Sequence, residues 1–229
     1  MSVAHVSSEI SFLEAIKARP HWHVVLHPQV FEERRLGSRD EMWSCIKNCR
    51  VSLRERDYPH VYEDCDKGAD WVASWGESAG QSGYWRFFQS GQLVHRISFF
   101  EDRLRLQGSP PPFLDFLEVL FTVTEIFEFS ARLANRAVFG PSASVTVELL
   151  RIVGRKLLTE AHPPVCYETR GALITPTLEC CWAGQITELA GRSAELALEQ
   201  AKSFFGGFGG SPVSDRMLTE RQRRFLERT

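Results

Sequence analysis

The sequence lacks the segments that direct proteins into or across membranes. Its beginning, MSVAHVSSEISFLEAIKARP, has no basic stretch followed by the apolar run of a secretory signal. No uncharged apolar run reaches the roughly 18 residues that a membrane-spanning helix needs. We therefore expect a cytoplasmic protein with no membrane contact.

An excess of either charge is also missing. The chain has 27 Lys and Arg against 29 Asp and Glu, which gives a formal net charge of -2 at pH 7. Strong non-specific binding to nucleic acid needs basic side chains clustered on one face. The composition therefore excludes a strongly basic module and an acidic tail, and leaves a local basic patch open.

Signatures of catalysis are absent as well. The sequence contains no Gly-rich phosphate loop and no G-x-S-x-G nucleophile elbow. It also contains no internal repeat, which argues against a repeat protein. Six cysteines in a cytoplasmic protein are expected to be reduced thiols, so no disulfide framework is predicted. The sequence favours a non-enzymatic protein without a cofactor.

What the sequence does contain is ample apolar material for a packed core. Hydrophobic residues make up 43% of it, including 16 Phe and 6 Trp. The pattern predicts an α+β fold in which an antiparallel sheet packs against two long helices, with a short N-terminal helix and a tethered C-terminal helix. We expect a single α+β domain over residues 1–205, a Gly-rich linker over 206–213 and a docking helix over 214–229.

Several short runs of β-branched and aromatic residues are typical of strands. The clearest is YWRFFQSGQLVHRISFF, in which Ser90 and Gly91 separate two apolar runs and predict a β-hairpin. The connections are too short for crossover helices, so the sheet should be antiparallel. The other expected strands cover Trp22–His27, Trp71–Trp75, Leu104–Leu106, Ser144–Leu150 and Val165–Ile174.

Helices are predicted from capping residues and apolar periodicity. Ser7 and Ser8 cap a helix that ends before Pro20, and Ser38 with Glu41 forms a capping box for a helix that ends near Arg50. The remaining expected helices are Phe113–Val138, Thr175–Phe204 with Pro176 in its first turn, and Ser214–Arg228.

Two groups of polar and aromatic residues are candidate binding sites. The turn-forming cluster Asp57-Tyr58-Pro59-His60 has Arg54 beside it, and Trp85, Arg86, Gln89 and His95 lie on the predicted hairpin. Aromatic residues mixed with hydrogen-bonding groups are typical of peptide and nucleic-acid sites. The same mixture is typical of an ordinary half-buried sheet, and the cluster is typical of a capped turn.

Metal sites can be drawn from two sets of residues. One set of possible zinc ligands is Cys45, Cys49, His60 and Cys65. Their spacing is not that of a structural zinc site. It favours instead a helix with Cys45 and Cys49 on its apolar face. His21, His23 and His27 share one face of a strand, where the favoured interpretation is a face turned away from the core. No metal is therefore predicted.

The C-terminal helix has a narrow apolar stripe within a charged surface. A helix this short is marginal alone, so it should dock on something. A protein partner, either a second copy or another protein, is expected to contact Met217, Leu218, Arg221, Arg224 and Phe225.

Three segments carry a family resemblance: Leu53–His60 (LRERDYPH), Tyr84–His95 (YWRFFQSGQLVH) and Val123–Leu133 (VTEIFEFSARL). Over residues 20–138 the chain resembles the region that follows Schlafen AlbA-type DNA-binding domains in uncharacterised bacterial proteins. The resemblance implies a bacterial setting and work within a larger complex near nucleic acid. It transfers no site residues, and no AlbA-type domain precedes the region here.

Three functions compete on these grounds. The leading hypothesis is a non-enzymatic protein-interaction or sensor module. The second is a nucleic-acid-associated accessory protein that uses the hairpin aromatics and a set of basic residues, namely Arg34, Arg35, Arg39, Arg50, Arg54 and Arg56. The third is an enzyme built around Asp57, His60 and His95.

Overall fold

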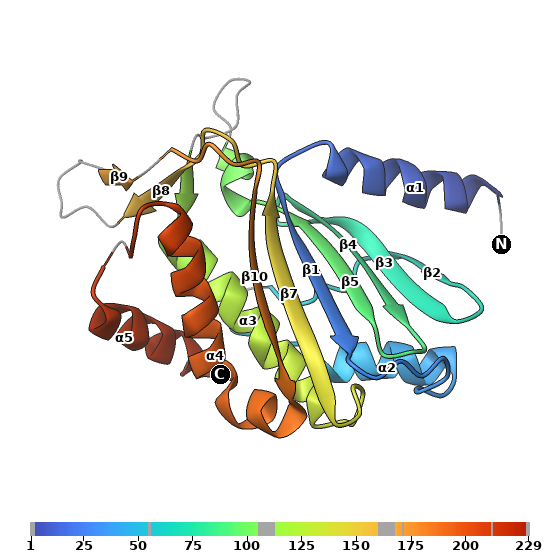
Figure 1. Ribbon diagram of the computed structural model, residues 1–229. Coiled ribbons are helices and arrows are strands. Elements are labelled where there is room, and N and C mark those ends of the chain that lie inside the picture. Colours follow the sequence, from blue (N-terminus) through green and yellow to red (C-terminus); the bar gives the residue numbers. More distant parts are fainter. Residues whose placement is uncertain are drawn as a thin grey trace.

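An antiparallel sheet forms the centre of the computed structural model, which describes residues 3–54, 56–104, 113–159, 168–170, 172–211 and 213–227. Within these residues the sheet has seven strands in the order β10-β7-β1-β5-β4-β3-β2 (Figure 1). The strands are β1 (His21–Pro28), β2 (Asp64–Lys67), β3 (Trp71–Ser78), β4 (Gln81–Phe88), β5 (Leu93–Ser98), β7 (Ser142–Leu150) and β10 (Thr177–Gln185). The α+β fold with an antiparallel sheet is therefore confirmed.

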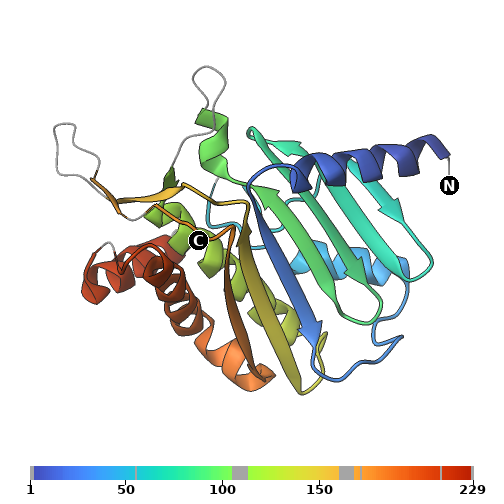
Figure 2. The same cartoon turned by 45° about the horizontal axis from the view of Figure 1, so that its top comes forward.

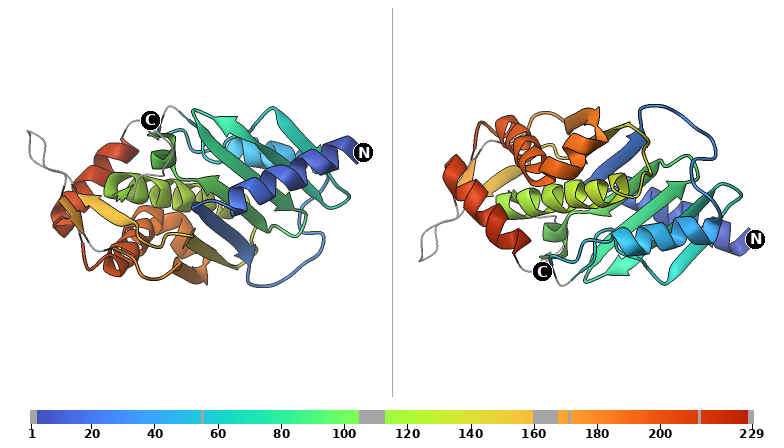
Figure 3. Two further views of the ribbon diagram at one scale, coloured as in Figure 1. Left: turned by 90° about the horizontal axis from the view of Figure 1, so that it is seen from above. Right: turned by 90° about the horizontal axis from the view of Figure 1, so that it is seen from below.

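Helices cover both faces of this sheet. They are α1 (Val3–Lys17), α2 (Arg39–Cys49), α3 (Phe116–Ala134), α4 (Ile186–Gly207) and α5 (Asp215–Leu226). Helices α2, α3 and α4 lie on one face, which we call the inner face, and α1 lies on the opposite, outer face (Figures 2 and 3). Helix α5 packs against α3 and α4 beyond the edge of the sheet.

The alternation of side chains along β1 decides which groups enter the core. Trp22, Val24 and Leu26 are buried in the main hydrophobic cluster, so the residues between them point to the outer face. Val24 pairs with His95 of β5, which places His95 on the inner face as well. This register puts a histidine beneath helix α3.

A second, smaller sheet contains β6 (Phe113–Asp115), β8 (Lys156–Thr159) and β9 (Glu168–Arg170). The sequence predicts a strand over Val165–Ile174. Within this range β9 is a strand, whereas residues 165–167 and 171 lie outside the described residues. The strand expected at Leu104–Leu106 is wrong at its first residue, because Leu104 ends a 3-10 helix that starts at Phe100. Residues 105 and 106 lie outside the described residues.

Two local predictions are confirmed in detail. The backbone N–H of Glu41 donates to Ser38 Oγ and that of Ser38 donates to Glu41 Oε2, so the capping box starts α2. Strands β4 and β5 form the predicted hairpin around Gly91, whose φ of 87° lies in the left-handed region that glycine adopts readily. Helix α1 is present too, although it begins at Val3, before the expected caps.

The helix expected over Thr175–Phe204 is wrong in its first third. Thr177–Gln185 forms β10, which pairs with β7 along its whole length, and α4 begins only at Ile186. Cys180 and Trp182 alternate into the core, as strand residues do. Pairing with an available sheet edge therefore overrode the Thr-Pro signal for a helix start.

The segment expected as a linker over 206–213 is part of the packed body at its beginning. Helix α4 continues through Gly207, and Phe208 is 2% exposed. The helix expected over Phe113–Val138 starts later, at Phe116, because Phe113–Asp115 pairs with β8 and Asp115 caps α3. One hydrophobic cluster runs from β1 to α5.

No helix in the described part of the chain combines the length and the apolar character that a membrane span requires.

Candidate functional site

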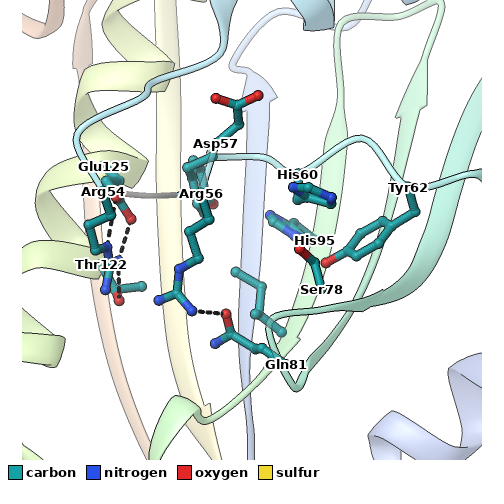
Figure 4. Close-up of a pocket in the computed structure, with 12 residues that line it drawn as sticks. Arg54, Arg56, Asp57, His60, Tyr62, Ser78, Gln81, His95, Thr122 and Glu125 are labelled. Atoms are coloured by element: carbon teal, nitrogen blue, oxygen red, sulfur yellow. Dashed lines mark hydrogen bonds and ion pairs between the residues drawn. The ribbon is translucent and has the colours of Figure 1, made fainter. Parts of the chain in front are cut away.

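A pocket opens on the inner face, between β4, β5, α3 and the loop that follows α2 (Figure 4). Its enclosed volume is small, about 30 Å³, and reaches about 420 Å³ only when the open solvent at its mouth is included. Polar and aromatic side chains dominate its lining: Arg54, Arg56, Asp57, Tyr58, His60, Tyr62, Ser78, Gln81, His95, Thr122 and Glu125, together with Ile97. The pocket thus joins segments that lie far apart in the sequence.

Tyr58 and His95 form the inner wall of the pocket. The loop that carries Tyr58 is fixed by two backbone hydrogen bonds of 2.8 Å that Val51 and Tyr58 exchange. The Tyr58 ring lies 5.1 Å from the His95 ring and 5.8 Å from Phe129 of α3, measured between centroids. Both side chains are therefore held rigidly by the core.

These two side chains bury polar atoms that the described part of the chain does not satisfy. Tyr58 Oη and both ring nitrogens of His95 have no hydrogen-bond partner among the described residues, although Tyr58 is 5% and His95 2% exposed. His60 Nδ1, at the rim, is in the same situation. Buried polar groups are nearly always hydrogen-bonded in native proteins, so a cluster of such atoms at one pocket needs a reason.

Burial also keeps these groups uncharged. It lowers the pKa of His95 to about 3 and raises the pKa of Tyr58 well above its usual value. At neutral pH the His95 ring therefore offers one donor and one acceptor, and the Tyr58 hydroxyl offers both.

An ion-pair cluster forms the neighbouring wall. Arg54 holds Glu125 through both of its carboxylate oxygens, with a 2.8 Å bond from Nε, and also pairs with Glu118. Its Nη2 donates to Thr122 Oγ1 at 3.0 Å. Glu125 is 1% exposed, so its charge depends on Arg54 for compensation.

The two remaining charged groups of the lining are paired as well. Arg56 pairs with Glu118 at 3.4 Å and donates to Gln81, whose amide nitrogen in turn donates to the Ser98 carbonyl at 2.6 Å. Asp57 accepts from Arg50 and from Ser52 Oγ. Two arginines and two carboxylates thus balance across the lining.

Tyr62 closes the outer side of the pocket, where its ring lies 4.7 Å from that of His60. A Cβ atom on Gly83 would stand 1.9 Å from Tyr62 Oη, so this wall depends on a strand residue without a side chain.

The structure brings together five of the eight binding residues expected from the sequence: Arg54, Asp57, Tyr58, His60 and His95. The other three lie elsewhere. Trp85 is fully buried and donates to the His60 carbonyl at 2.7 Å, and Arg86 pairs with Glu9 of α1 on the outer face. Gln89 Nε2 donates to the carbonyls of Leu36 and Gly37, so it fixes a loop.

Sequence reasoning missed six pocket residues, namely Tyr62, Ser78, Gln81, Ile97, Thr122 and Glu125. Thr122 and Glu125 carried a signal, because they interrupt an otherwise apolar face of the long helix at a spacing of three. A buried carboxylate there requires a cationic partner from another segment.

Five of the six basic residues expected to contact nucleic acid bind within the chain, and the sixth, Arg34, is exposed. Arg50 and Arg54 pair with carboxylates, and Arg35 pairs with Glu32 at 3.4 Å. Arg39 donates to the Gly68 carbonyl and Arg56 donates to Gln81. Paired guanidinium groups add little to the attraction of a phosphate backbone.

The expected zinc ligands do not converge on one point. Cys49 is buried in the main cluster, Cys65 is exposed on β2, and His60 lies at the pocket. His23 and His27 hydrogen-bond to Glu148 and Ser144 on the outer face. Among the described residues, no three His, Cys, Asp or Glu side chains are placed to hold one metal ion.

The C-terminal helix docks on its own chain. Leu218 and Phe225 are 0% and 1% exposed, and the Phe225 ring stacks on Phe121 of α3 at 4.1 Å. Two of the residues expected to contact a partner therefore face the core. Packing there removes the apolar stripe of the helix from water. Met217 and Arg224 remain exposed.

Comparison of the chain with family models, with curated proteins and with solved structures found no match. The site is therefore interpreted from its own geometry.

Proposed function

We propose that this chain is a non-enzymatic sensor module, which binds a small uncharged ligand in the inner pocket and reports its occupancy to a protein partner. One observation carries the proposal: Tyr58 and His95 line the pocket, and each contains buried polar atoms without a partner among the described residues. A ligand that hydrogen-bonds to them would satisfy these groups.

The chemistry of the wall favours an uncharged ligand. The charged groups of the lining all have partners, since Arg54 pairs with Glu125, Asp57 with Arg50 and Arg56 with Glu118, and Tyr58 and His95 are neutral at pH 7. A charged ligand would lose its hydration without gaining an opposite charge. A ligand with one donor and one acceptor, such as an amide or a heteroaromatic ring, matches the imidazole and the hydroxyl.

The same groups are poorly suited to acid–base catalysis. A general base works best with a pKa near the working pH, and burial lowers that of His95 to about 3. The carboxylate of Asp57 is occupied by Arg50 and Ser52. Binding is therefore favoured over turnover.

A route for the signal runs through Arg54. Its guanidinium group lines the pocket and also lies 5.9 Å from the Phe225 ring of α5. A ligand that shifts Arg54 would alter the docking of this helix. The exposed side of α5, with Met217 and Arg224, is where we place the partner, which is either a second copy or another protein of a larger complex.

Fragment binding tests the ligand part of the proposal. The full chain is screened by ligand-observed NMR against uncharged amides and heteroaromatic compounds, in parallel with the Tyr58→Phe variant. Compounds that bind the pocket should lose affinity about tenfold or more in the variant, since one hydrogen bond in a buried site is removed. Tyr84→Phe is the matched control, because its hydroxyl donates to Glu9 on the outer face. The proposal fails if no compound distinguishes the two variants.

Affinity purification from native cells tests the partner part. Tagged wild-type chain and a Met217→Ala/Arg224→Ala variant are compared by mass spectrometry, with and without nuclease. A stoichiometric protein that resists nuclease and is lost with the variant supports the proposal. Partners that disappear on nuclease treatment would instead support the nucleic-acid hypothesis.

A further inference from the structure

A second hollow lies on the other side of the sheet and is basic. It opens where α1 leads into β1, beside the end of β7 and the start of β10, and it has a volume of about 710 Å³ with its open mouth included. Its polar lining consists of Lys17, His21, Arg96, Arg151 and Thr177. Lys17 and His21 are close in the sequence, and the other three residues come from separate parts of the chain. The lining contains three cations and no carboxylate.

Arg96 is the anchor of this hollow. It is half-buried on β5, directly after His95, and therefore points to the outer face. Among the described residues it has no ion pair with a carboxylate, whereas Glu148 on β7 is engaged by His23 at 2.6 Å. The carboxylates of Glu148 and Glu14 act on Arg96 only from beyond ion-pair distance, so several of its N–H donors are open to a ligand.

His21 holds this guanidinium in place. Its Nδ1 hydrogen-bonds to the Arg19 carbonyl at 2.7 Å, so Nε2 is the acceptor that receives Arg96 Nη1 at 2.8 Å. Burial lowers the pKa of His21 to about 4, which keeps the ring neutral and able to accept. The histidine thereby orients one edge of Arg96 and leaves the others open.

Arg151, also in the lining, has an unusual backbone conformation. It follows β7 with a φ of 60°, in the left-handed region that favours glycine, yet the residue is an exposed arginine. Non-glycine residues in this region are enriched at functional sites. Lys17, the third cation, comes from the last turn of α1 and pairs with the exposed Glu14 at 2.8 Å, so a ligand would share it with this carboxylate.

We propose that this hollow is a binding site for a phosphate group, either free or carried by a small molecule as a monoester. Three cations around one opening match the double negative charge of a phosphate monoester better than the single charge of a carboxylate. The planar forks of two arginines also suit phosphate oxygens. The site lies on the opposite face from the pocket of Tyr58 and is independent of the sensor proposal.

NMR titration of the full-length ¹⁵N-labelled chain tests this site. The probes are inorganic phosphate, phenyl phosphate and acetate at pH 7.5, and the signals are the backbone amides around Lys17, Arg96 and Arg151. We expect saturable shifts with phosphate or phenyl phosphate and much weaker binding of acetate. Comparison of the first two probes tells whether the ligand is free phosphate or an ester.

Three variants locate the binding. Arg96→Gln and Arg151→Gly should each weaken phosphate binding about tenfold or more, because each removes charge-assisted hydrogen bonds. Glycine at position 151 suits the left-handed backbone, so this variant keeps the fold intact. Arg192→Gln is the matched control for net charge, since Arg192 is exposed on α4 and pairs with Glu188 and Glu195. Unchanged affinity in Arg151→Gly, equal binding of acetate, or no saturable shift would each overturn the proposal.

Discussion

Tyr58 is a residue whose polar group is expected to weaken the free protein. Its hydroxyl is buried and has no partner among the described residues, and an unsatisfied buried group costs about 1 to 3 kcal/mol. Tyr58→Phe should therefore raise the free energy of unfolding by about 1 kcal/mol, as measured by urea denaturation.

Tyr84→Phe is the control for this prediction, because it should change the free energy of unfolding in the opposite direction. The hydroxyl of Tyr84 donates to Glu9 at 2.9 Å, so its removal should lower the free energy of unfolding by about 1 kcal/mol. Destabilisation of similar size in both variants would show that Tyr58 is satisfied in the free protein. Binding sites commonly contain polar groups that lower the stability of the free protein and hydrogen-bond to the ligand.

His95 should make the protein sensitive to acid. Burial lowers its folded-state pKa from 6.5 to about 3, so the folded protein excludes a proton that the unfolded chain binds. The stability that depends on the neutral ring is complete above pH 6.5 and is lost as the pH falls from 6.5 towards 3. The slope is about 1.4 kcal/mol per pH unit.

The variant His95→Phe removes this contribution. Between pH 6.5 and 5 the wild type should lose about 2 kcal/mol more in the free energy of unfolding than the variant, in paired urea denaturation curves. Other groups, such as His21, contribute equally to both proteins. Parallel losses in the two proteins would mean that His95 is protonated in the folded state.

At the scale of elements, helix α5 is predicted to be an integral part of the fold. Phe225 is buried and stacks on Phe121, so Phe225→Ala should lower the free energy of unfolding by about 3 to 5 kcal/mol. Arg224→Ala, on the exposed side of the same helix, should change it by less than about 0.5 kcal/mol. Equal small effects in urea denaturation would show a helix that is not packed.

Elements with a local cause were predictable from the sequence. The capping box of α2 and the Gly91 turn of the β4–β5 hairpin each depend on residues a few positions apart. The division between β10 and α4 was not predictable, because Thr175 and Pro176 are an acceptable helix start in isolation. Only the free edge of β7, which comes from another part of the chain, makes Thr177–Gln185 a strand.

The site followed the same rule. Tyr58 and His60 were found as neighbours in one turn, and His95 was named on the hairpin. Their meeting depends on the pairing of Val51 with Tyr58 and on the register that sets His95 opposite Val24. The partnership of Arg54 with Glu125 spans 71 residues, so no local pattern shows it.

At the scale of the whole molecule, Arg54 connects the pocket to the C-terminal helix. It compensates the buried charge of Glu125, and its guanidinium lies over the Phe225 ring. Arg54→Met should lower the free energy of unfolding by about 3 to 5 kcal/mol, because Glu125 would be left buried and unpaired. Adding Glu125→Leu should recover much of this loss, since an apolar pair can replace a buried ion pair.

Hydrogen exchange on these variants tests whether the pocket and α5 are coupled. In the Arg54→Met/Glu125→Leu double variant, stability returns but the cation no longer faces Phe225. The amides of α5 (Asp215–Leu226) should therefore exchange faster than in the wild type, while those of α2 (Arg39–Cys49) keep their protection. A uniform change across both helices would reflect global stability alone. Unchanged exchange in α5 would show that Arg54 does not couple the pocket to this helix. The proposed sensor would then have to couple ligand binding to the partner through other residues.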